Sequence, residues 1–365
     1  MTYISFLYRE KGGNGVMIDT NKYFDIYKIL PYQRSFNLIN AIRSVGKTYV
    51  IQWWCMDKAI KNHREIVALF RTQNEIDKGI LEQWYFKVLQ NEFSEYVFKF
   101  NKREIWREYE DEKGNIQKDV LVRAFALSEY RTVKKMSMPL VNYIIFDEYI
   151  IEDGLISDYY RGWNEPSALL SIYHSIDRDE HRVKVFMMAN TSSFYNPYHL
   201  DGFFDIPTPT LGKIWTSKEV LFWWVEPSEM LKKEKENDEF FKATLKSLYG
   251  KFANTSTYNE DKETFIHDVP FQSIVMCSLI YENEVYTVYN NVPLDGNVYI
   301  KDCHDRRSKI TYALTLDDHS ENTFLVKSQS FSHINFIKKA LQCGRLRFDN
   351  IKCKKKFDGA LKILS

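Results

Sequence analysis

The first 225 residues alternate between short apolar runs and longer mixed segments. The runs Val141–Phe146 and Val183–Ala189 are nearly all apolar, which is typical of strands buried on both faces of a parallel sheet. Mixed segments such as Lys47–Lys61 and Gln73–Leu89 lie between such runs and are compatible with helices. Strands that alternate with helices predict a parallel α/β sheet, with the ligand at the C-terminal ends of the strands.

The other elements expected in this part follow the same alternation. They are strands at Phe36–Ile39, Glu65–Arg71 and Val220–Val225, a helix at Ser167–Ile176, and a hairpin of Tyr96–Arg107 with Val120–Ala126 around a turn at 111–115. An extra strand between the first strand and Val141–Phe146 favours the additional-strand branch of the α/β nucleotide-binding folds.

The pattern changes after residue 226. Leu231–Glu239 is a charge-mixed helical stretch, and Asn254–Lys262 is polar and loop-like. Strands are then expected at Ser273–Tyr281, Val285–Tyr289, Asn297–Ile300 and Lys309–Leu314, followed by a helix at Ser332–Gln342 and a basic tail. We therefore divide the chain into an N-terminal extension (1–28), an α/β domain (29–226), a lid or linker (227–268) and an α+β C-terminal domain (269–365).

A short loop after the first strand has the layout of a phosphate-binding (Walker A) loop, because it ends in Gly-Lys-Thr and leads into a helix. We expect Lys47 to reach the β and γ phosphates and Thr48 to hold Mg²⁺. The usual first glycine of the motif is alanine here. The loop consists of Ala41, Ile42, Arg43, Ser44, Val45, Gly46, Lys47 and Thr48.

A second motif lies 100 residues further on, where the run Val141–Phe146 ends in Asp147 and Glu148. A carboxylate at the end of a central strand can hold Mg²⁺, and a second carboxylate directly after it can polarise the attacking water. Two solvated acids would be the default interpretation of an isolated Asp-Glu pair. Because both motifs occur in order and each follows a strand, the sequence predicts a site for a nucleoside triphosphate and Mg²⁺, and the resemblance described below implies that the nucleotide is ATP. Asn190 ends a neighbouring strand and fits a polar γ-phosphate sensor, or else a strand-end cap.

Composition limits the other classes of function. The chain has 365 residues, 50 Lys or Arg and 49 Asp or Glu, so its net charge of +1 creates no global attraction to nucleic acid or membrane. From Phe336 to Ser365, however, nine basic residues face two Asp. The five cysteines show no metal-ligand spacing, and we expect reduced thiols. No apolar run approaches the ~20 residues that span a bilayer, so we expect a soluble intracellular protein.

Four features in order along the chain carry a family resemblance. They are Arg43 inside the phosphate loop, Ile145–Ile150, the pair Ala189-Asn190 with the later Asn196-Pro197-Tyr198, and Arg345–Asn350. Together they resemble the DNA-packaging (encapsidation) ATPases of phi29-like small podophages, from about Ile29 to the C-terminus. The resemblance implies a homopentameric ring on the capsid portal, directly or through a structural RNA. Such a ring would pump double-stranded DNA into an empty capsid in the host cytoplasm.

The resemblance also implies a P-loop additional-strand ATPase domain and a C-terminal RNase H-like domain, a vestigial nuclease. It gives Lys47, Thr48, Asp147 and Glu148 the roles described above. It places Arg178 or Arg182 as an arginine finger supplied to the neighbouring subunit, and the Lys134-Lys135 pair in a DNA-channel loop. For the arginines a charged surface loop is the alternative, and for the lysines a solvated pair.

The basic C-terminal residues, among them Lys354, Lys355 and Lys356, surround Phe348 and Phe357. They would hold DNA or structural RNA, dock on the capsid, or form a solvated tail. Two rival functions stay open. One is a terminase with an active nuclease, although the strand 273–281 lacks the acid that a two-metal nuclease needs. The other is a nucleotide-binding nucleic-acid module in which the alanine at the start of the loop has abolished catalysis.

Overall fold

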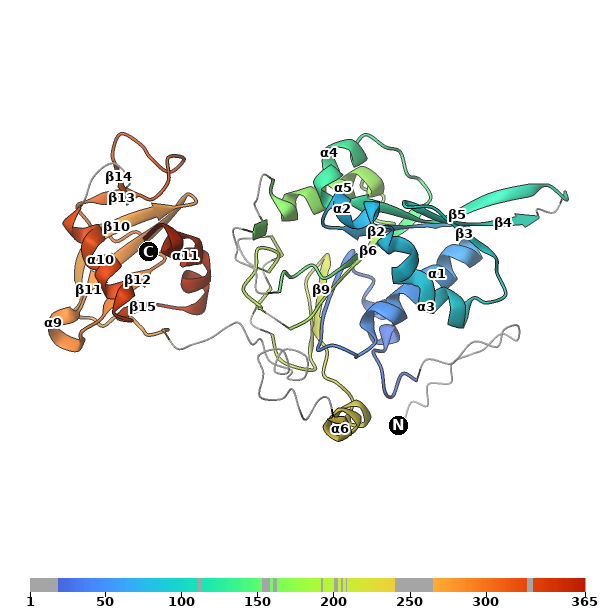
Figure 1. Ribbon diagram of the computed structural model, residues 1–365, viewed down its shortest axis with the longest axis horizontal. Helices are drawn as coiled ribbons and strands as arrows, with labels where there is room; N and C mark the ends of the chain where they lie inside the picture. Colours follow the sequence, from blue (N-terminus) through green and yellow to red (C-terminus); the bar gives the residue numbers. More distant parts are fainter. Residues whose placement is uncertain are drawn as a thin grey trace. The chain divides into compact units, whose positions relative to one another are not determined.

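A computed structural model describes most of the chain (Figure 1). The described residues are 19–110, 113–152, 158–159, 163–191, 193–199, 203–204, 206–207, 209–239, 265–326 and 331–364. The chain divides into two compact units, Met1–Ile150 with Trp163–Thr191 and Ile206–Thr257, and Ile151–Gly162 with Ser192–Asp205 and Tyr258–Ser365. The stretches 151–162 and 192–205 thus group with the second unit, although they lie within the expected α/β domain.

The first unit contains a nine-stranded sheet in the order β3-β4-β5-β2-β6-β7-β1-β9-β8. Its strands are β1 (Phe36–Asn40), β2 (Glu65–Phe70), β3 (Phe98–Phe100), β4 (Glu104–Glu110), β5 (Ile116–Ala126), β6 (Val141–Asp147), β7 (Lys184–Ala189), β8 (Ile214–Thr216) and β9 (Val220–Trp224). The six strands β5-β2-β6-β7-β1-β9 run parallel to one another, whereas β3, β4 and β8 at the edges pair in antiparallel fashion. Because β7 lies between β1 and β6, the sheet has the expected additional-strand arrangement.

Helices cover both faces of this sheet (Figure 1). They are α1 (Lys47–Asn62), α2 (Gln73–Asp77), α3 (Ile80–Glu92), α4 (Tyr130–Val133), α5 (Glu165–Asp177) and α6 (Glu229–Asn237), with short 3₁₀ turns η1 (Ile26–Lys28), η2 (Leu30–Tyr32) and η3 (Leu127–Glu129). Trp54 of α1 packs on Phe186, whereas Tyr173 of α5 packs on Phe36, which pairs with the residue before Phe186. Because side chains alternate along a strand, the two helices lie on opposite faces.

The hairpin region differs from the prediction in one place. The expected single strand Tyr96–Arg107 is interrupted, because the Asn101 side chain accepts hydrogen bonds from the backbone N–H groups of Arg103 and Glu104 at 2.8 and 2.7 Å. This local side-chain bonding competes with strand pairing and turns the chain between β3 and β4. The resulting turn joins β3 to β4 as an antiparallel hairpin, and β4 then pairs with β5.

The segment before β1 is part of the first unit. Phe24, Ile26 and Ile29 are each 1% exposed and belong to its core cluster. The Phe24 N–H donates to the Val45 carbonyl at 2.9 Å, which attaches this segment to the phosphate loop. Residues 19–28 therefore pack with the α/β unit rather than forming part of an added extension, and residues 1–18 lie outside the described chain.

The second unit has a six-stranded sheet in the order β14-β13-β10-β11-β12-β15. Its elements are β10 (Ile274–Tyr281), β11 (Glu284–Asn290), α9 (Val292–Asp295), β12 (Val298–Lys301), β13 (Thr311–Ala313), β14 (Phe324–Leu325), α10 (Ser332–Gln342), β15 (Leu346–Phe348) and α11 (Ile351–Leu364). β10, β11 and β12 form an antiparallel meander, and β13 returns parallel to β10. This arrangement agrees with the expected RNase H-like α+β fold.

The basic C-terminal segment is not a solvated tail. Residues 351–364 form α11, and Cys353, Phe357, Ala360 and Leu364 are fully buried against the second sheet. Their spacing places them on one face of a helix, and the lysines between them stay at the rim. Among the helices that the structure describes, each is too short or too polar to cross a lipid bilayer.

Candidate nucleotide-binding site

The loop between β1 and α1 is shaped to hold an anion. Ser44 and Gly46 adopt left-handed conformations, with φ of 69° and 85°, and Gly46 directly precedes the first turn of α1. Successive N–H groups in such a loop, together with the positive end of the helix, form a concave phosphate site. Ala41 is not among the residues with positive φ, so the missing glycine does not strain the loop.

The side chains of the two sequence motifs meet at the C-terminal edge of the first sheet. The Thr48 hydroxyl donates to Asp147 Oδ2 at 2.8 Å, and Lys47 Nζ donates to Asn190 Oδ1 at 3.0 Å. Asp147 ends β6 and Asn190 directly follows β7, so the parallel strands bring both to the loop after β1. The structure thus brings together four residues that the sequence singled out separately.

The surroundings of Asp147 fit a divalent cation. Burial raises the pKa of the Asp147 carboxyl, while the Lys47 ammonium and the Thr48 hydroxyl lower it. A hydroxyl beside one carboxylate is the ligand set expected for Mg²⁺, which takes one or two protein oxygens and completes its shell with phosphate and water. The described residues contain no group of three or more His, Cys, Asp or Glu that could form an all-protein metal cage.

Glu148 is exposed beside this carboxylate and adopts a left-handed backbone conformation, with φ of 55°. Its N–H donates to Asp147 Oδ1 at 3.0 Å. The next residue is fixed on both sides, since the Tyr149 hydroxyl donates to Asn40 Oδ1 at 2.8 Å and its N–H donates to the Met188 carbonyl at 3.1 Å. A non-glycine residue with positive φ is uncommon, and such strain often occurs at functional sites.

Arg71, directly after β2, is a site residue that the sequence did not reveal. Its guanidinium donates to the carbonyls of Glu148 and Tyr149 at 3.2 and 3.1 Å. It also makes a bidentate pair with the buried Glu165, at 2.8 and 3.0 Å. The sequence signal that could have indicated Arg71 is its position directly after β2, a strand that runs parallel to β6. Nothing local marks Glu165 as its partner.

Lys235 of α6 is a second residue that the sequence did not single out. Its Nζ donates to the Arg43 carbonyl inside the phosphate loop at 2.8 Å. Burial lowers the pKa of Lys235 to about 8, with a further contribution from the positive charge of Lys47. The charge-mixed helical stretch of the expected lid or linker therefore places one lysine against the phosphate loop.

The two candidate finger arginines have different surroundings. Arg178 is exposed at the C-terminal cap of α5, with φ of 52°. Arg182 donates to the backbone carbonyls of Val141, Met138 and Ile176 and pairs with Glu180. A side chain that satisfies three carbonyls of its own subunit is poorly suited to reach a neighbouring one. The geometry therefore favours Arg178 over Arg182 for that role.

The candidate nucleic-acid residues lie in two separate parts of the chain, Lys134 and Lys135 in the first unit and Lys354, Lys355 and Lys356 in the second. Lys134 and Lys135 are exposed directly after α4. Lys354, Lys355 and Lys356 lie on α11, where Lys356 pairs with Glu284 at 2.8 Å. Phe348 and Phe357 are buried in the core of the second unit, so neither offers a surface for stacking on bases.

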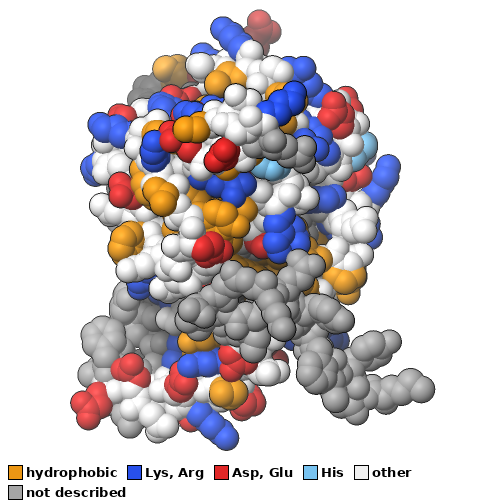
Figure 2. Space-filling view, turned by 90° about the vertical axis from the view of Figure 1, so that its right-hand side faces the viewer, with side chains coloured by type: hydrophobic (Ala, Val, Ile, Leu, Met, Phe, Trp, Pro, Cys, Tyr) orange, Lys and Arg blue, Asp and Glu red, His pale blue; other side chains and the backbone are white. Residues whose placement is uncertain are grey.

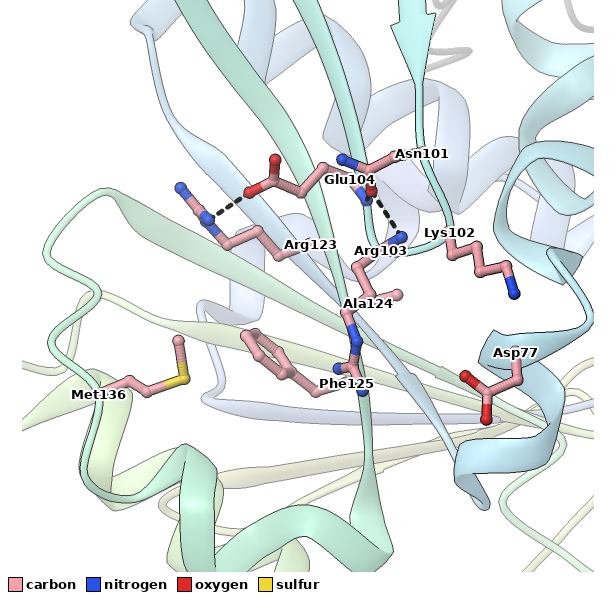
Figure 3. Close-up of a pocket in the computed structure, with 9 residues that line it drawn as sticks. All are labelled: Asp77, Asn101, Lys102, Arg103, Glu104, Arg123, Ala124, Phe125 and Met136. Atoms are coloured by element: carbon pink, nitrogen blue, oxygen red, sulfur yellow. Dashed lines mark hydrogen bonds and ion pairs between the residues drawn. The ribbon is translucent and has the colours of Figure 1, made fainter.

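A cavity of about 580 Å³ lies beside β4 and β5 in the first unit (Figure 3). Its arginines are already paired, since Arg123 bonds Glu65 and Glu104, and Arg103 bonds Glu129. On the face of the molecule in Figure 2, basic and acidic side chains are likewise interspersed. Neither the cavity nor this face has the concentrated positive charge that an additional phosphate site would need.

A phosphate loop followed by a hydroxyl–carboxylate contact, with a strand between β1 and β6, defines a P-loop nucleotide-binding protein of the additional-strand class. The chain belongs to the podovirus DNA encapsidation protein (Gp16) family, whose model matches residues 18–361. The DNA packaging protein of Bacillus phage phi29 is 28% identical over 334 residues, 91% of this chain and 95% of the relative. That of Bacillus phage B103 is 26% identical over 327 residues, 88% and 95% of the two chains.

Solved structures show the same fold. The bacteriophage phi29 viral genome packaging motor assembly matches with a TM-score of 0.69 and 24% identity, over 94% of this chain and 99% of that one. The phi28 gp11 DNA packaging motor matches with a TM-score of 0.54 and 18% identity, over 94% and 98%. The expected family and fold class are thus confirmed.

Proposed function

We propose that this DNA packaging protein is an ATP-driven motor that translocates double-stranded viral DNA into a preformed capsid. The observation that carries the proposal is the meeting of Lys47, Thr48, Asp147 and Asn190 at one edge of the first sheet, beside the exposed Glu148. These are the groups that bind a nucleoside triphosphate and orient water for attack on it. Membership of the DNA encapsidation family supports DNA as the cargo.

Hydrolysis would depend mainly on positioning and electrostatics. The loop N–H groups and the Lys47 ammonium bind the phosphates, and Asn190 holds Lys47 in place while contacting the terminal phosphate. Thr48 and Asp147 would hold Mg²⁺, which neutralises charge on the phosphate oxygens when it is bound. The Glu148 carboxylate orients the attacking water and accepts its proton. The contacts of Lys47 with Asn190 and of Thr48 with Asp147 support these roles, and Glu148 directly follows Asp147.

The motor is proposed to act as a homopentameric ring at the capsid portal, directly or through a structural RNA, in the host cytoplasm. Arg178 would complete the site of the neighbouring subunit, because a permanently charged planar guanidinium stabilises charge on a transferring phosphoryl group. Lys134 and Lys135, and Lys354, Lys355 and Lys356, would contact DNA phosphates without reading sequence. The relative whose fold matches is described as a viral genome packaging motor assembly, which supports this context.

The test is steady-state ATP hydrolysis with and without double-stranded DNA, first for the free protein and then on empty capsids. Glu148→Gln is expected to abolish DNA-stimulated turnover and to leave ATP binding intact. Glu95→Gln, which changes an exposed glutamate elsewhere in the same unit, is the matched control and should behave as wild type. Absence of turnover on capsids, with ATP still bound, would reject the motor and favour the non-catalytic module.

An active terminase nuclease is the other candidate, and the second sheet offers little support for it. A two-metal nuclease needs carboxylates that converge on a metal pair, starting from the first central strand. The corresponding strand, β10, contains no acidic residue. Metal-dependent cutting of plasmid DNA by the full chain would be needed to adopt this alternative.

A further inference from the structure

The short helix α4 carries a stack of flat side-chain groups at the surface of the first unit. The Tyr130 and Trp163 rings are stacked, with centroids 6.3 Å apart and planes inclined by 26°. The Arg131 guanidinium lies over the Tyr130 ring, 5.7 Å from its centroid, and its Nε donates to the Tyr130 hydroxyl at 3.2 Å. We call Tyr130, Arg131 and Trp163 the α4 platform. Both rings are half-buried and the arginine is exposed, so the platform keeps flat surface that solvent reaches.

The two rings of the platform come from separately anchored elements. α4 has only four residues, and Val133, which is 1% exposed, fixes it in the core. Trp163 directly precedes Asn164, whose side chain caps α5 by accepting from the Ser167 N–H at 2.8 Å. α4 in turn packs against α5 (Figure 1). The platform therefore exists before a ligand binds, which lowers the entropic cost of binding one.

Positive charge gathers beside the platform. Arg131, Lys134 and Lys135 are all exposed, and among the residues that the structure describes none forms an ion pair with them. Glu129 is the one acidic residue in the stretch 127–136, and its carboxylate is engaged by Arg103, with Nη2 2.9 Å from Oε1. The three basic side chains are thus available to attract phosphate groups.

A flat platform beside available cations matches a nucleic-acid strand whose bases are unpaired. Aromatic rings and guanidinium planes stack on unpaired bases, while lysines bind the neighbouring phosphates. In a double helix the bases are already stacked on one another, and a protein reaches only phosphates, sugars and base edges. A surface that only followed a duplex backbone would need the lysines but not the stacked rings.

We propose that the α4 platform binds an unpaired nucleobase, with Lys134 and Lys135 on the flanking phosphates. The ligand is a single-stranded segment of nucleic acid, a chemistry that unpaired DNA and the loops of a structural RNA share. The inference rests on the proposed function for the phosphate contacts of the two lysines. It adds a base contact that following duplex DNA does not require.

The experiment measures binding of the full-length protein to labelled strands of equal length and charge by fluorescence anisotropy. The strands are oligo(dT), an abasic DNA strand and oligo(U). Because oligo(dT) and the abasic strand carry the same phosphates, their difference in affinity reports the bases alone. Wild type is expected to bind oligo(dT) at least about fivefold more tightly than the abasic strand. Equal affinities for these two strands would overturn the inference.

The comparison of oligo(U) with oligo(dT) identifies the source of the base. Tighter binding of oligo(U) would point to a structural RNA, and tighter binding of oligo(dT) to unpaired DNA. Either result supports the platform, provided that the abasic strand binds more weakly than both.

Substitutions separate the base contact from the phosphate contacts. Tyr130→Ala should weaken oligo(dT) binding at least about fivefold and remove the preference over the abasic strand, whereas Tyr130→Phe keeps the ring and should retain most of it. The double variant Lys134→Ala/Lys135→Ala should weaken both strands alike and reduce the salt dependence. An equal loss on both strands in Tyr130→Ala would contradict base stacking.

Phe86→Ala is the matched control, because Phe86 is an aromatic residue of α3 in the same unit and is 56% exposed. It should change no affinity. Thermal melting checks that each variant is folded. Arg131→Gln gives a second test that leaves both rings in place, and it should also reduce the preference for oligo(dT) over the abasic strand.

Failure of this inference and failure of the proposed function give different results. Protein that prefers oligo(dT) over the abasic strand but shows no DNA-stimulated ATP hydrolysis on capsids would refute the motor and leave the base contact standing. Protein that hydrolyses ATP in response to duplex DNA but binds both strands equally would refute the base contact alone.

Discussion

Replacing Arg71 by methionine separates the positioning of Glu148 from the binding of ATP. Methionine keeps an apolar stem but removes the charge, all donors and the guanidinium that lies over the Phe146 ring. Glu165 is 2% exposed and Arg71 24% exposed, so the substitution leaves a buried carboxylate without its guanidinium. Breaking a fully buried pair costs about 3–5 kcal/mol, and this partly exposed one should cost about 2–3 kcal/mol.

The effect on catalysis comes from the two carbonyls that Arg71 holds. A left-handed conformation such as that of Glu148 costs a non-glycine residue about 1–2 kcal/mol, so it needs support from its surroundings. Each hydrogen bond from a charged donor is worth about 1.5–3 kcal/mol, and losing both should let Glu148 relax. We expect kcat to fall at least about tenfold, which corresponds to 1.4 kcal/mol, while ATP affinity changes less than about twofold.

The assay is DNA-stimulated ATP hydrolysis on capsids at saturating ATP, together with urea unfolding of each variant. Arg103→Met is the control, because Arg103 pairs with Glu129 in the same unit and makes no contact with Glu148. The double variant Arg71→Met/Glu165→Gln should recover part of the stability but none of the activity. Normal kcat in correctly folded Arg71→Met would refute the positioning role and leave Arg71 a purely structural residue.

Two other predictions concern stability. Arg182→Ala should lower the free energy of unfolding by about 1–3 kcal/mol, because three backbone carbonyls lose their donor. Arg178→Ala should melt as wild type and lose ATP turnover only in assembled rings. The reverse result would assign the structural role to Arg178 and the finger role to Arg182. Burial lowers the pKa of His199 from 6.5 to about 3. The unfolded chain therefore binds the proton first, and stability present above pH 6.5 should fall by about 1.4 kcal/mol per unit below it. His199→Gln should remove this slope, and an unchanged slope would contradict the assignment.

The α/β unit could be predicted because its strands are buried on both faces and therefore appear as uninterrupted apolar runs. β6 and β7 fall within one residue of the expected ranges for this reason. The C-terminal helix was missed although its signal is present, since Cys353, Phe357 and Ala360 recur at helical spacing. The lysines between these residues favour the interpretation of a solvated tail. They separate, in the linear sequence, apolar residues that form a continuous stripe only on one face of a helix.

The residues of the candidate site also differ in how well the sequence predicts them. Lys47, Thr48, Asp147 and Asn190 could be predicted because each lies at the end of a strand or in the loop after one, and parallel strands bring their C-terminal ends to one edge. Arg71 and Lys235 act on carbonyls that lie 77 and 192 residues away in sequence. A backbone carbonyl carries no residue signature, so no pattern along the chain could indicate these contacts. They follow only from the packing of α5 and α6.

Ala41 departs from the Walker A sequence motif but meets the conformational requirement of its position in the loop. A glycine is required only where φ is positive or where the backbone must approach a neighbour closely. In this loop the left-handed positions are Ser44 and Gly46, while Ala41 is fully buried and its N–H donates to the Ala189 carbonyl at 3.2 Å. The alanine methyl fills core space and the hydrogen bond ties the loop to β7, next to Asn190. The absent glycine therefore gives no reason to regard the site as degenerate, because the conformation that cradles phosphate depends on residues further along the loop.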